Sequence, residues 1–293
     1  MDKTNEQSHF NVSGSDKVSE LLANNFLRLR MGVGVYDAFT ARLANQSRCD
    51  FIWLSSYCCS ATNGFPDCDL LALDYLEAIA KSVKRASCAP LVLDGGSSLG
   101  DVQRVRGLAA VASNSNAAAI CIEDYIGHKF SSLYDSVQRR LVPRKQQQTC
   151  IAVAVEELRN SNCAVIARPE SLVAGLDHSD LLVRSKDAAE AGASAIFVQS
   201  KRASLNELYL FLSAWDGQLP VFVAPTLFPD EPHDRLYSLG VTHIIYANHL
   251  LRAAHKAMTS VLDDMWLDRG TARLEPHISP ISDISSLFPH PEA

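Results

Sequence analysis

The stretch Ala164-Val165-Ile166-Ala167-Arg168-Pro169-Glu170 is a short apolar run that ends abruptly in charged residues. The segments Leu91-Val92-Leu93-Asp94 and Ile120-Cys121-Ile122-Glu123-Asp124 have the same form. Runs of aliphatic residues of this length are typical of strands that are buried on both faces, as in parallel sheets. Because α/β barrels carry their chemistry at the C-terminal ends of such strands, these segments predict one charged, metal-dependent site.

Strand-like segments alternate with segments of helical periodicity along the chain. Apolar residues recur at spacings of three and four between Leu70 and Val83 and between Leu205 and Trp215. Strict alternation predicts a parallel sheet with right-handed crossovers, and eight such units in about 230 residues match a closed (β/α)8 TIM-type barrel. An open doubly wound sheet is the alternative, but no G-x-G-x-x-G pattern follows the first strand. The expected strands are Val33–Val35, Phe51–Leu54, Leu91–Asp94, Ala119–Glu123, Ala164–Arg168, Ala195–Gln199, Val221–Ala224 and His243–Tyr246.

The composition narrows the class of protein. The chain has 293 residues, of which 47% are hydrophobic and 20% charged, enough to bury a large core. Its formal net charge of -6 and the lack of any Lys/Arg run predict no nucleic-acid partner. No apolar run approaches the ~18 residues of a membrane span, and the polar start lacks the apolar centre of a signal peptide. We therefore expect a cytoplasmic protein without membrane attachment.

The eight cysteines are scattered and form no C-x-x-C pair. In a chain of this length they are expected to be reduced packing residues rather than a disulfide framework. Metal binding by the adjacent Cys58 and Cys59 is an alternative, disfavoured because no spaced partner motif accompanies them.

Three segments are expected along the chain. Residues 1–24 form a polar N-terminal tail, residues 25–267 the barrel with its C-terminal helix, and residues 268–293 a tail that contains four prolines. The helix expected at Leu251–Leu267 has an apolar face that the barrel of its own subunit need not cover.

Acidic residues are the candidate metal ligands. Asp94 and Glu123 stand at strand ends, and Asp67 lies in the loop after the second strand. Clustered carboxylates with few other ligand types favour Mg²⁺. The alternative for each residue alone is a solvated charge or a helix cap. Three carboxylates on one barrel face favour the functional interpretation.

Other polar residues suit an anionic ligand. The planar guanidinium of Arg168 matches carboxylate or phosphoryl groups, and Glu170 is placed to hold or neutralise it. The segment Ser55-Ser56-Tyr57 offers hydroxyl and backbone N–H groups to an oxyanion. Lys129 lies in a polar loop after the fourth strand that could close over a ligand.

The order of these motifs resembles the phosphoenolpyruvate mutase/isocitrate lyase superfamily over residues 25–265. The motifs that begin at Gln199 and Ala247 resemble its mutase and phosphonopyruvate hydrolase branch more than its lyases. In chain order the motifs are Val35-Tyr36-Asp37-Ala38 with Ala41-Arg42-Leu43, Phe51-Ile52-Trp53-Leu54-Ser55-Ser56, Ile122-Glu123-Asp124, Ala167-Arg168-Pro169-Glu170, Gln199-Ser200-Lys201-Arg202, and Ala247-Asn248-His249 with Arg252-Ala253.

The resemblance implies a homo-oligomer, dimer or tetramer, whose last helix is swapped between subunits. It implies that a small anionic 2-oxo acid or phosphonate binds through Mg²⁺ and reacts through a stabilised enolate. By resemblance, Asp94 is the direct metal ligand, while Asp67 and Glu123 act through metal-bound water. The other implied roles are substrate binding by Trp53, Ser55, Ser56, Tyr57, Arg168, Glu170 and Gln199, and catalysis by Lys129, Arg168 and Ser131.

Four departures from the superfamily's motifs bear on the site. The third-strand motif D-x-D-T-G-Y-G has Gly96 here in place of its second aspartate. The mutase signature E-D-K-x-x-x-x-x-N-S has Tyr125 and Ser131 in place of its lysine and asparagine, and Gln199 replaces a pocket histidine. These departures imply weaker Mg²⁺ binding and altered electrostatics in the site.

The expected function is therefore a mutase-like enzyme that acts on phosphonopyruvate or a related small 2-oxo acid, in phosphonate metabolism. A lyase or hydrolase of the same superfamily, acting on a C–C or C–P bond, is the first alternative. A barrel that has lost catalysis and serves as a binding partner is the second.

Overall fold

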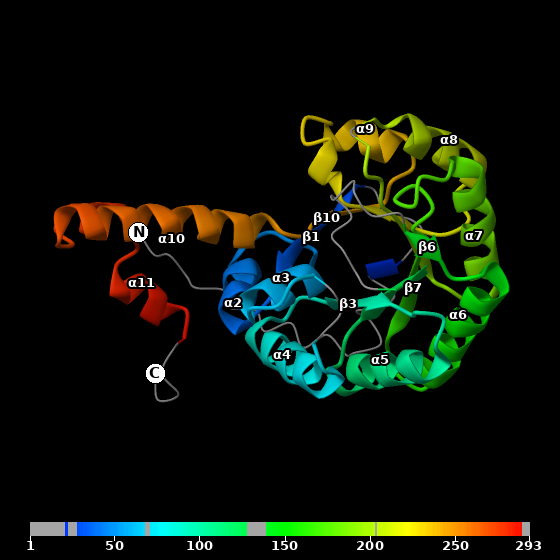
Figure 1. The fold of residues 1–293 in the computed structure, drawn as a ribbon, viewed down its shortest axis with the longest axis horizontal. Coiled ribbons are helices and arrows are strands. Elements are labelled where there is room, and N and C mark those ends of the chain that lie inside the picture. The colour runs from blue at the N-terminus through cyan, green and yellow to red at the C-terminus, as the bar shows by residue number, and fades with distance from the viewer. Residues whose placement is uncertain (1–20, 23–27, 68–70, 128–138, 203, 289–293) are drawn as a thin grey trace, which may run out of the picture.

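The computed structural model describes residues 21–22, 28–67, 71–127, 139–202 and 204–288. Within these residues, eight parallel strands close into a barrel in the order β1-β10-β9-β8-β7-β4-β3-β2 (Figure 1). The predicted (β/α)8 fold is confirmed. The barrel strands are β1 (Arg30–Val35), β2 (Phe51–Leu54), β3 (Leu91–Ser97), β4 (Ala119–Glu123), β7 (Ala164–Arg168), β8 (Ala195–Val198), β9 (Val221–Val223) and β10 (His243–Tyr246).

The helices that follow the strands form a ring around the barrel (Figure 1). The periodicity that predicted α4 corresponds to its buried face, which carries Leu76, Ala80 and Val83. The ring consists of α2 (Ala38–Gln46), α4 (Leu73–Ala86), α5 (Val102–Asn114), α6 (Arg144–Leu158), α7 (His178–Glu190), α8 (Asn206–Trp215) and α9 (His233–Ser238), and the short α3 (Ser56–Thr62) follows β2.

Two features at the C-terminal end of the barrel were not expected from the sequence. Strand β3 continues past Asp94 through a register shift against β4, and Gly96 adopts a φ of +63° there. After β4, the short strands β5 (Tyr125–Ile126) and β6 (Arg140–Leu141) pair antiparallel as a separate ribbon. Both features lie at the strand ends where the predicted site residues stand.

The strands separate two clusters of buried side chains. Ile52 and Leu54 of β2 pack in the cluster that includes the helix residues, whereas Phe51 and Trp53 belong to a second cluster. Since side chains alternate across a strand, the second cluster fills the interior of the barrel.

The interior cluster includes Leu21, whose carbonyl oxygen lies 2.7 Å from Nε2 of the buried His243. The imidazole of His243 is stacked on Phe222 with 3.9 Å between ring centroids. Leu21, which lies within the segment predicted as a polar tail, therefore packs in the interior of the barrel.

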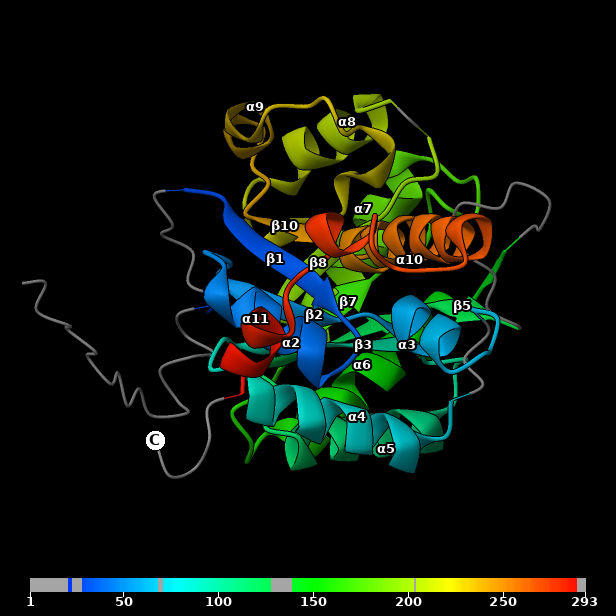
Figure 2. The same cartoon turned by 90° about the vertical axis from the view of Figure 1, so that its left-hand side faces the viewer.

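Helix α10 (His249–Asp268) projects away from the ring of helices (Figure 1) and has no buried residue. Its exposed apolar side chains include Met258, Leu262 and Trp266, the last of which is 82% exposed. The chain then forms a 3-10 turn (Glu275–His277) and the short α11 (Ile281–Ser286). Figure 2 shows α11 in front of α2, and the guanidinium of Arg42 lies 5.9 Å from the ring centroid of Phe288.

No helix in the described part of the chain is both long enough and apolar enough to cross a membrane.

Candidate active site

A cavity of about 510 Å³ opens at the C-terminal ends of the barrel strands. It is where barrels of this class place their chemistry. Most of the residues predicted for the site line it together. Its lining consists of Trp53, Ser55, Ser56, Tyr57, Asp67, Asp94, Glu123, Arg139, Arg168, Phe197, Gln199, Ala224, Thr226, Leu227, Ala247, Asn248 and Arg252. Lys129 and Ser131, both predicted to be catalytic, lie outside the described residues.

The carboxylate of Asp94 is fixed by the segment that follows β2. Ser56 donates to Asp94 Oδ2 from its hydroxyl at 2.7 Å and from its backbone N–H at 3.2 Å. On the other oxygen, the N–H of Gly96 donates to Asp94 Oδ1 at 3.3 Å. The side chain is buried at the edge of the cavity, and these donors set its orientation. Asp94 is therefore a preorganised oxygen ligand.

The two serines predicted to hold a substrate carboxylate make protein contacts. The hydroxyl of Ser55 caps α3 by accepting from the N–H of Cys58 at 3.3 Å. Ser56 donates to Asp94 as described above. Strand β2 runs directly into the short helix α3. The hydroxyl of Ser55 therefore accepts from a free N–H at the start of this helix, and the hydroxyl of Ser56 donates to the carboxylate of Asp94. Both serines still line the cavity.

Four charged side chains form a cluster beside Asp94, at the ends of the neighbouring strands β4 and β7. Arg168 donates from Nε to Glu170 Oε1 at 2.7 Å, and its Nη1 lies 2.9 Å from Glu123 Oε1. Arg139 contacts the second oxygen of each glutamate, with Nη1 at 2.6 Å from Glu170 Oε2 and 3.9 Å from Glu123 Oε2. Both glutamate side chains are fully buried. Each glutamate therefore bridges the two guanidinium groups.

The carboxylates of Glu123 and Glu170 keep Arg168 charged inside the barrel. Burial alone lowers the pKa of Arg168, but the negative charges of Glu123, Glu170 and Asp94 outweigh it and raise the pKa above its ordinary value. The guanidinium also lies over the ring of Phe197, 4.7 Å from its centroid. The site therefore contains a permanent, oriented cation.

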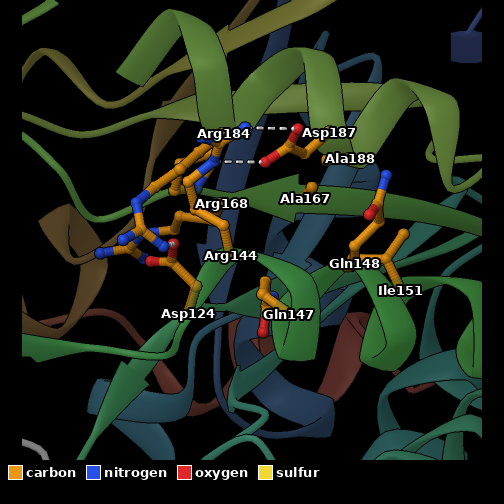
Figure 3. A pocket seen from close by; sticks show the side chains of 11 residues that line it. Asp124, Arg144, Gln147, Gln148, Ile151, Ala167, Arg168, Arg184, Asp187 and Ala188 are labelled. Carbon is orange, nitrogen blue, oxygen red and sulfur yellow. Dashed lines mark hydrogen bonds and ion pairs between the residues drawn. The ribbon is translucent and has the colours of Figure 1, made fainter. Parts of the chain in front are cut away.

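A second polar cluster lies between β4 and β7 on one side and α6 and α7 on the other (Figure 3). Asp124 accepts from the N–H of Glu170 at 2.7 Å and from Arg184 at 3.1 Å. Its burial raises its pKa to about 7. Arg144 pairs with Asp187 at 2.6 Å at the outer edge. The space between these groups is about 10 Å³, the room of one water molecule, so the cluster supports the backbone of Glu170 rather than a ligand.

The carboxylates of Asp67, Asp94 and Glu123 suit a cation that is coordinated by few protein ligands. Among the described residues, no three His, Cys, Asp or Glu side chains are grouped closely enough to hold a metal ion. Mg²⁺, however, binds proteins through one or two carboxylates and completes its shell with water and substrate oxygens. Asp94, with Asp67 and Glu123 in the same cavity, fits such a site.

The described cysteines do not contribute to the cavity. Cys58 and Cys59 are buried free thiols, and burial raises the pKa of Cys58 to about 11. A buried protonated thiol behaves as a small apolar group, in agreement with the packing role predicted for the cysteines.

Several lining residues were not identified as site residues from the sequence. Arg139 does not follow an apolar run in the sequence, and Phe197 resembles any other core residue of β8. Asn248 and Arg252 stand in the motif at the start of α10 and were noted only for its order in the chain. The sequence thus indicated about half of the lining, and the residues that it missed come from strands, helix starts and the segment before β6.

A closed α/β barrel with a carboxylate and an arginine at its C-terminal face defines the class of a TIM-barrel enzyme site. The family model for phosphoenolpyruvate phosphomutase matches residues 26–266, and the chain belongs to that family. The resemblance found in the sequence is confirmed.

Individual relatives agree with the family assignment. The phosphoenolpyruvate phosphomutase of Streptomyces hygroscopicus is 30% identical over 87% of this chain and 82% of the relative. The phosphonopyruvate hydrolase of Variovorax sp. (strain Pal2) is 29% identical over 89% of this chain and 90% of the relative.

Solved structures show the same fold. The phosphoenolpyruvate phosphomutase of Streptomyces platensis subsp. rosaceus superimposes with a TM-score of 0.88 at 29% identity, covering 94% of this chain and 95% of the other. A phosphonopyruvate hydrolase solved with oxalate and Mg²⁺ superimposes with a TM-score of 0.85 at 26% identity, with the same coverage.

Proposed function

We propose that this protein is a mutase-like enzyme that acts on phosphonopyruvate or a related small 2-oxo acid through an enolate stabilised by Mg²⁺. The observation that carries the proposal is the pairing, in one cavity, of the fixed Asp94 carboxylate with the permanently charged Arg168. Family membership supports it, as does the similar phosphonopyruvate hydrolase solved with oxalate and Mg²⁺.

Asp94 is the residue that would hold Mg²⁺ directly, with Asp67 and Glu123 accepting hydrogen bonds from the water around it. When bound, the cation supplies positive charge where the enolate oxygen develops negative charge. Ser56 keeps the Asp94 carboxylate aimed at this point.

Other residues of the cavity bind and orient the substrate. Arg168 receives a carboxylate or phosphonyl group, and Glu170 holds its guanidinium in place. Trp53 and Phe197, whose rings meet edge to face at 5.5 Å, form an apolar wall that excludes water from the enolate. Gln199 also lines the cavity, and its amide donates to the carbonyl of Ser200 at 3.2 Å.

Further parts of the proposal extend beyond the described site. Lys129 and Ser131, which lie between β5 and β6 in the sequence, remain proposed catalytic residues, and Tyr57 remains a proposed substrate contact. We further propose a cytoplasmic homo-oligomer, dimer or tetramer, held together by the swapped helix α10, whose apolar side chains are exposed. Phosphonate metabolism is the proposed context.

The decisive test is turnover of phosphonopyruvate, phosphoenolpyruvate, oxaloacetate and substituted malates with and without Mg²⁺. Asp94→Asn keeps the shape of the side chain and an acceptor for Ser56 but removes the charge. Mg²⁺-dependent activity should then fall at least about 100-fold, with a change in melting temperature of only a few degrees. The exposed Asp74 on α4 provides the matched control as Asp74→Asn.

The outcomes separate the possible functions. Isomerisation of phosphonopyruvate supports the mutase, and release of phosphate or of a C–C cleavage product indicates the hydrolase or lyase alternative. Thermal stabilisation by these ligands without turnover would favour the non-catalytic barrel. Full activity of the Asp94 variant would exclude the metal-dependent mechanism.

A further inference from the structure

Arg139, the second arginine of the charged cluster, does not stand at the end of a barrel strand. Arg139 immediately precedes β6, and its guanidinium lies over the ring of Tyr125, 4.8 Å from the centroid. The ribbon that carries it is attached to the barrel, since the N–H of Val142 donates to the carbonyl of Asp124 at 2.7 Å and the hydroxyl of Ser97 donates to the carbonyl of Tyr125. The guanidinium of Arg139 is thus held on the cavity wall before any ligand arrives.

Arg139 changes the charge of that wall. Glu123 and Glu170 together carry two negative charges, and Arg168 alone would leave a net charge of -1 in a buried position. With Arg139 the four groups balance, and only 8% of its side chain is exposed. A buried net negative charge repels an anionic ligand strongly because the surroundings screen it poorly. Arg139 therefore makes the charge of Arg168 available to a ligand.

Two neighbouring parts of the cavity lining suit two different groups of one ligand. The part with Asp94 and Ser56 suits the 2-oxo acid end, through the cation that Asp94 would hold. The part with Arg139 and Arg168 presents two guanidinium groups side by side, bridged by the same glutamates. A guanidinium has five N–H donors, so contact with glutamates is compatible with a further contact to an anion.

We propose that Arg139 is a specificity-determining residue that selects ligands carrying a second anionic group, a carboxylate or a phosphonate, on the carbon next to the 2-oxo group. This inference rests on the proposed function, since it concerns the same cavity. Pyruvate lacks that second group and phosphonopyruvate carries it. The ratio of the affinities for these two ligands measures the selection.

The experiment compares wild type with Arg139→Gln, Arg139→Lys and the control Arg140→Gln, in MgCl2. The affinity of pyruvate and of phosphonopyruvate is measured by titration calorimetry, with KM used where a ligand is turned over. Arg140 is the neighbouring residue, of the same charge, and it is exposed. Loss of a charged contact should reduce the preference of Arg139→Gln for phosphonopyruvate by about 10- to 100-fold. Affinity for pyruvate should change much less, and Arg140→Gln should behave as wild type.

Arg139→Lys keeps the charge and protects the test against misfolding of the glutamine variant. An ammonium cannot reproduce the planar contact with two glutamates and a ligand, so part of the preference should be lost. An unchanged preference in whichever of the two variants folds would overturn the role of Arg139 and leave the proposed function intact. A wild-type protein that binds neither ligand would overturn both.

Discussion

Replacing Gly96 by aspartate tests how this site differs from the family's motif. Gly96 has a φ of +63°, in the left-handed region, and its N–H donates to Asp94 Oδ1 at 3.3 Å. The motif of the family places an aspartate at this position. The change Gly96→Asp therefore adds a carboxylate two residues from the proposed Mg²⁺ ligand, within a segment where β3 shifts register against β4.

Gly96→Asp is expected to lower the stability of the fold and to raise the affinity for Mg²⁺. A non-glycine residue in the left-handed region costs about 1 kcal/mol, and aspartate and asparagine tolerate it best. For a domain of this size that corresponds to a decrease of about 2–4 °C in melting temperature. Each carboxylate that holds water around a cation typically changes metal affinity by about 10- to 100-fold. We expect Gly96→Asp to melt slightly lower and to bind Mg²⁺ more tightly by that factor.

The assay is calorimetric titration of Mg²⁺ into wild type, Gly96→Asp and Gly96→Asn. Asparagine has the same backbone cost and nearly the same shape but no charge, so the difference between the two variants isolates the carboxylate. If Gly96→Asp bound Mg²⁺ no more tightly than Gly96→Asn, the interpretation of Asp67, Asp94 and Glu123 as a metal site would be wrong. Restored mutase activity is not expected, because Tyr125, Ser131 and Gln199 also differ from the family's motifs.

Three further predictions concern other parts of the molecule. Arg168→Ala should cost about 2–5 kcal/mol of transition-state binding in kcat/KM, with partial rescue by Arg168→Lys; a fully active lysine variant would contradict the planar clamp. Burial lowers the pKa of His243 from 6.5 to about 4, so the unfolded state binds more protons between these values and stability is lost as pH falls. Urea unfolding should show about 2 kcal/mol less stability at pH 5 than at pH 7 from this group, a difference that His243→Gln should remove. Trp266→Asp on α10 should lower the molar mass seen by sedimentation, and a wild-type monomer at micromolar concentration would refute assembly through this helix.

The barrel could be predicted because its signal is local and repeated. Each strand is a short aliphatic run, and burial on both faces is what makes such a run continuous rather than alternating. The ribbon β5–β6 has no such signal, since strands of two residues bury almost nothing. The packing of Leu21 under the barrel depends on a hydrogen bond to His243, 222 positions away, which no local pattern encodes.

The site residues also differ in whether a local sequence pattern could locate them. Asp94, Glu123 and Arg168 end strands, and a parallel barrel brings all strand ends to one face, so their proximity follows from topology alone. Arg139 does not end a barrel strand, and its position depends on two buried glutamates, one from β4 and one from the segment after β7. Two glutamates and one arginine cannot be buried together without leaving a net charge, which is costly. The sequence placed Glu123, Arg168 and Glu170 on one face, and only the folded chain identifies Arg139 as the second guanidinium beside them.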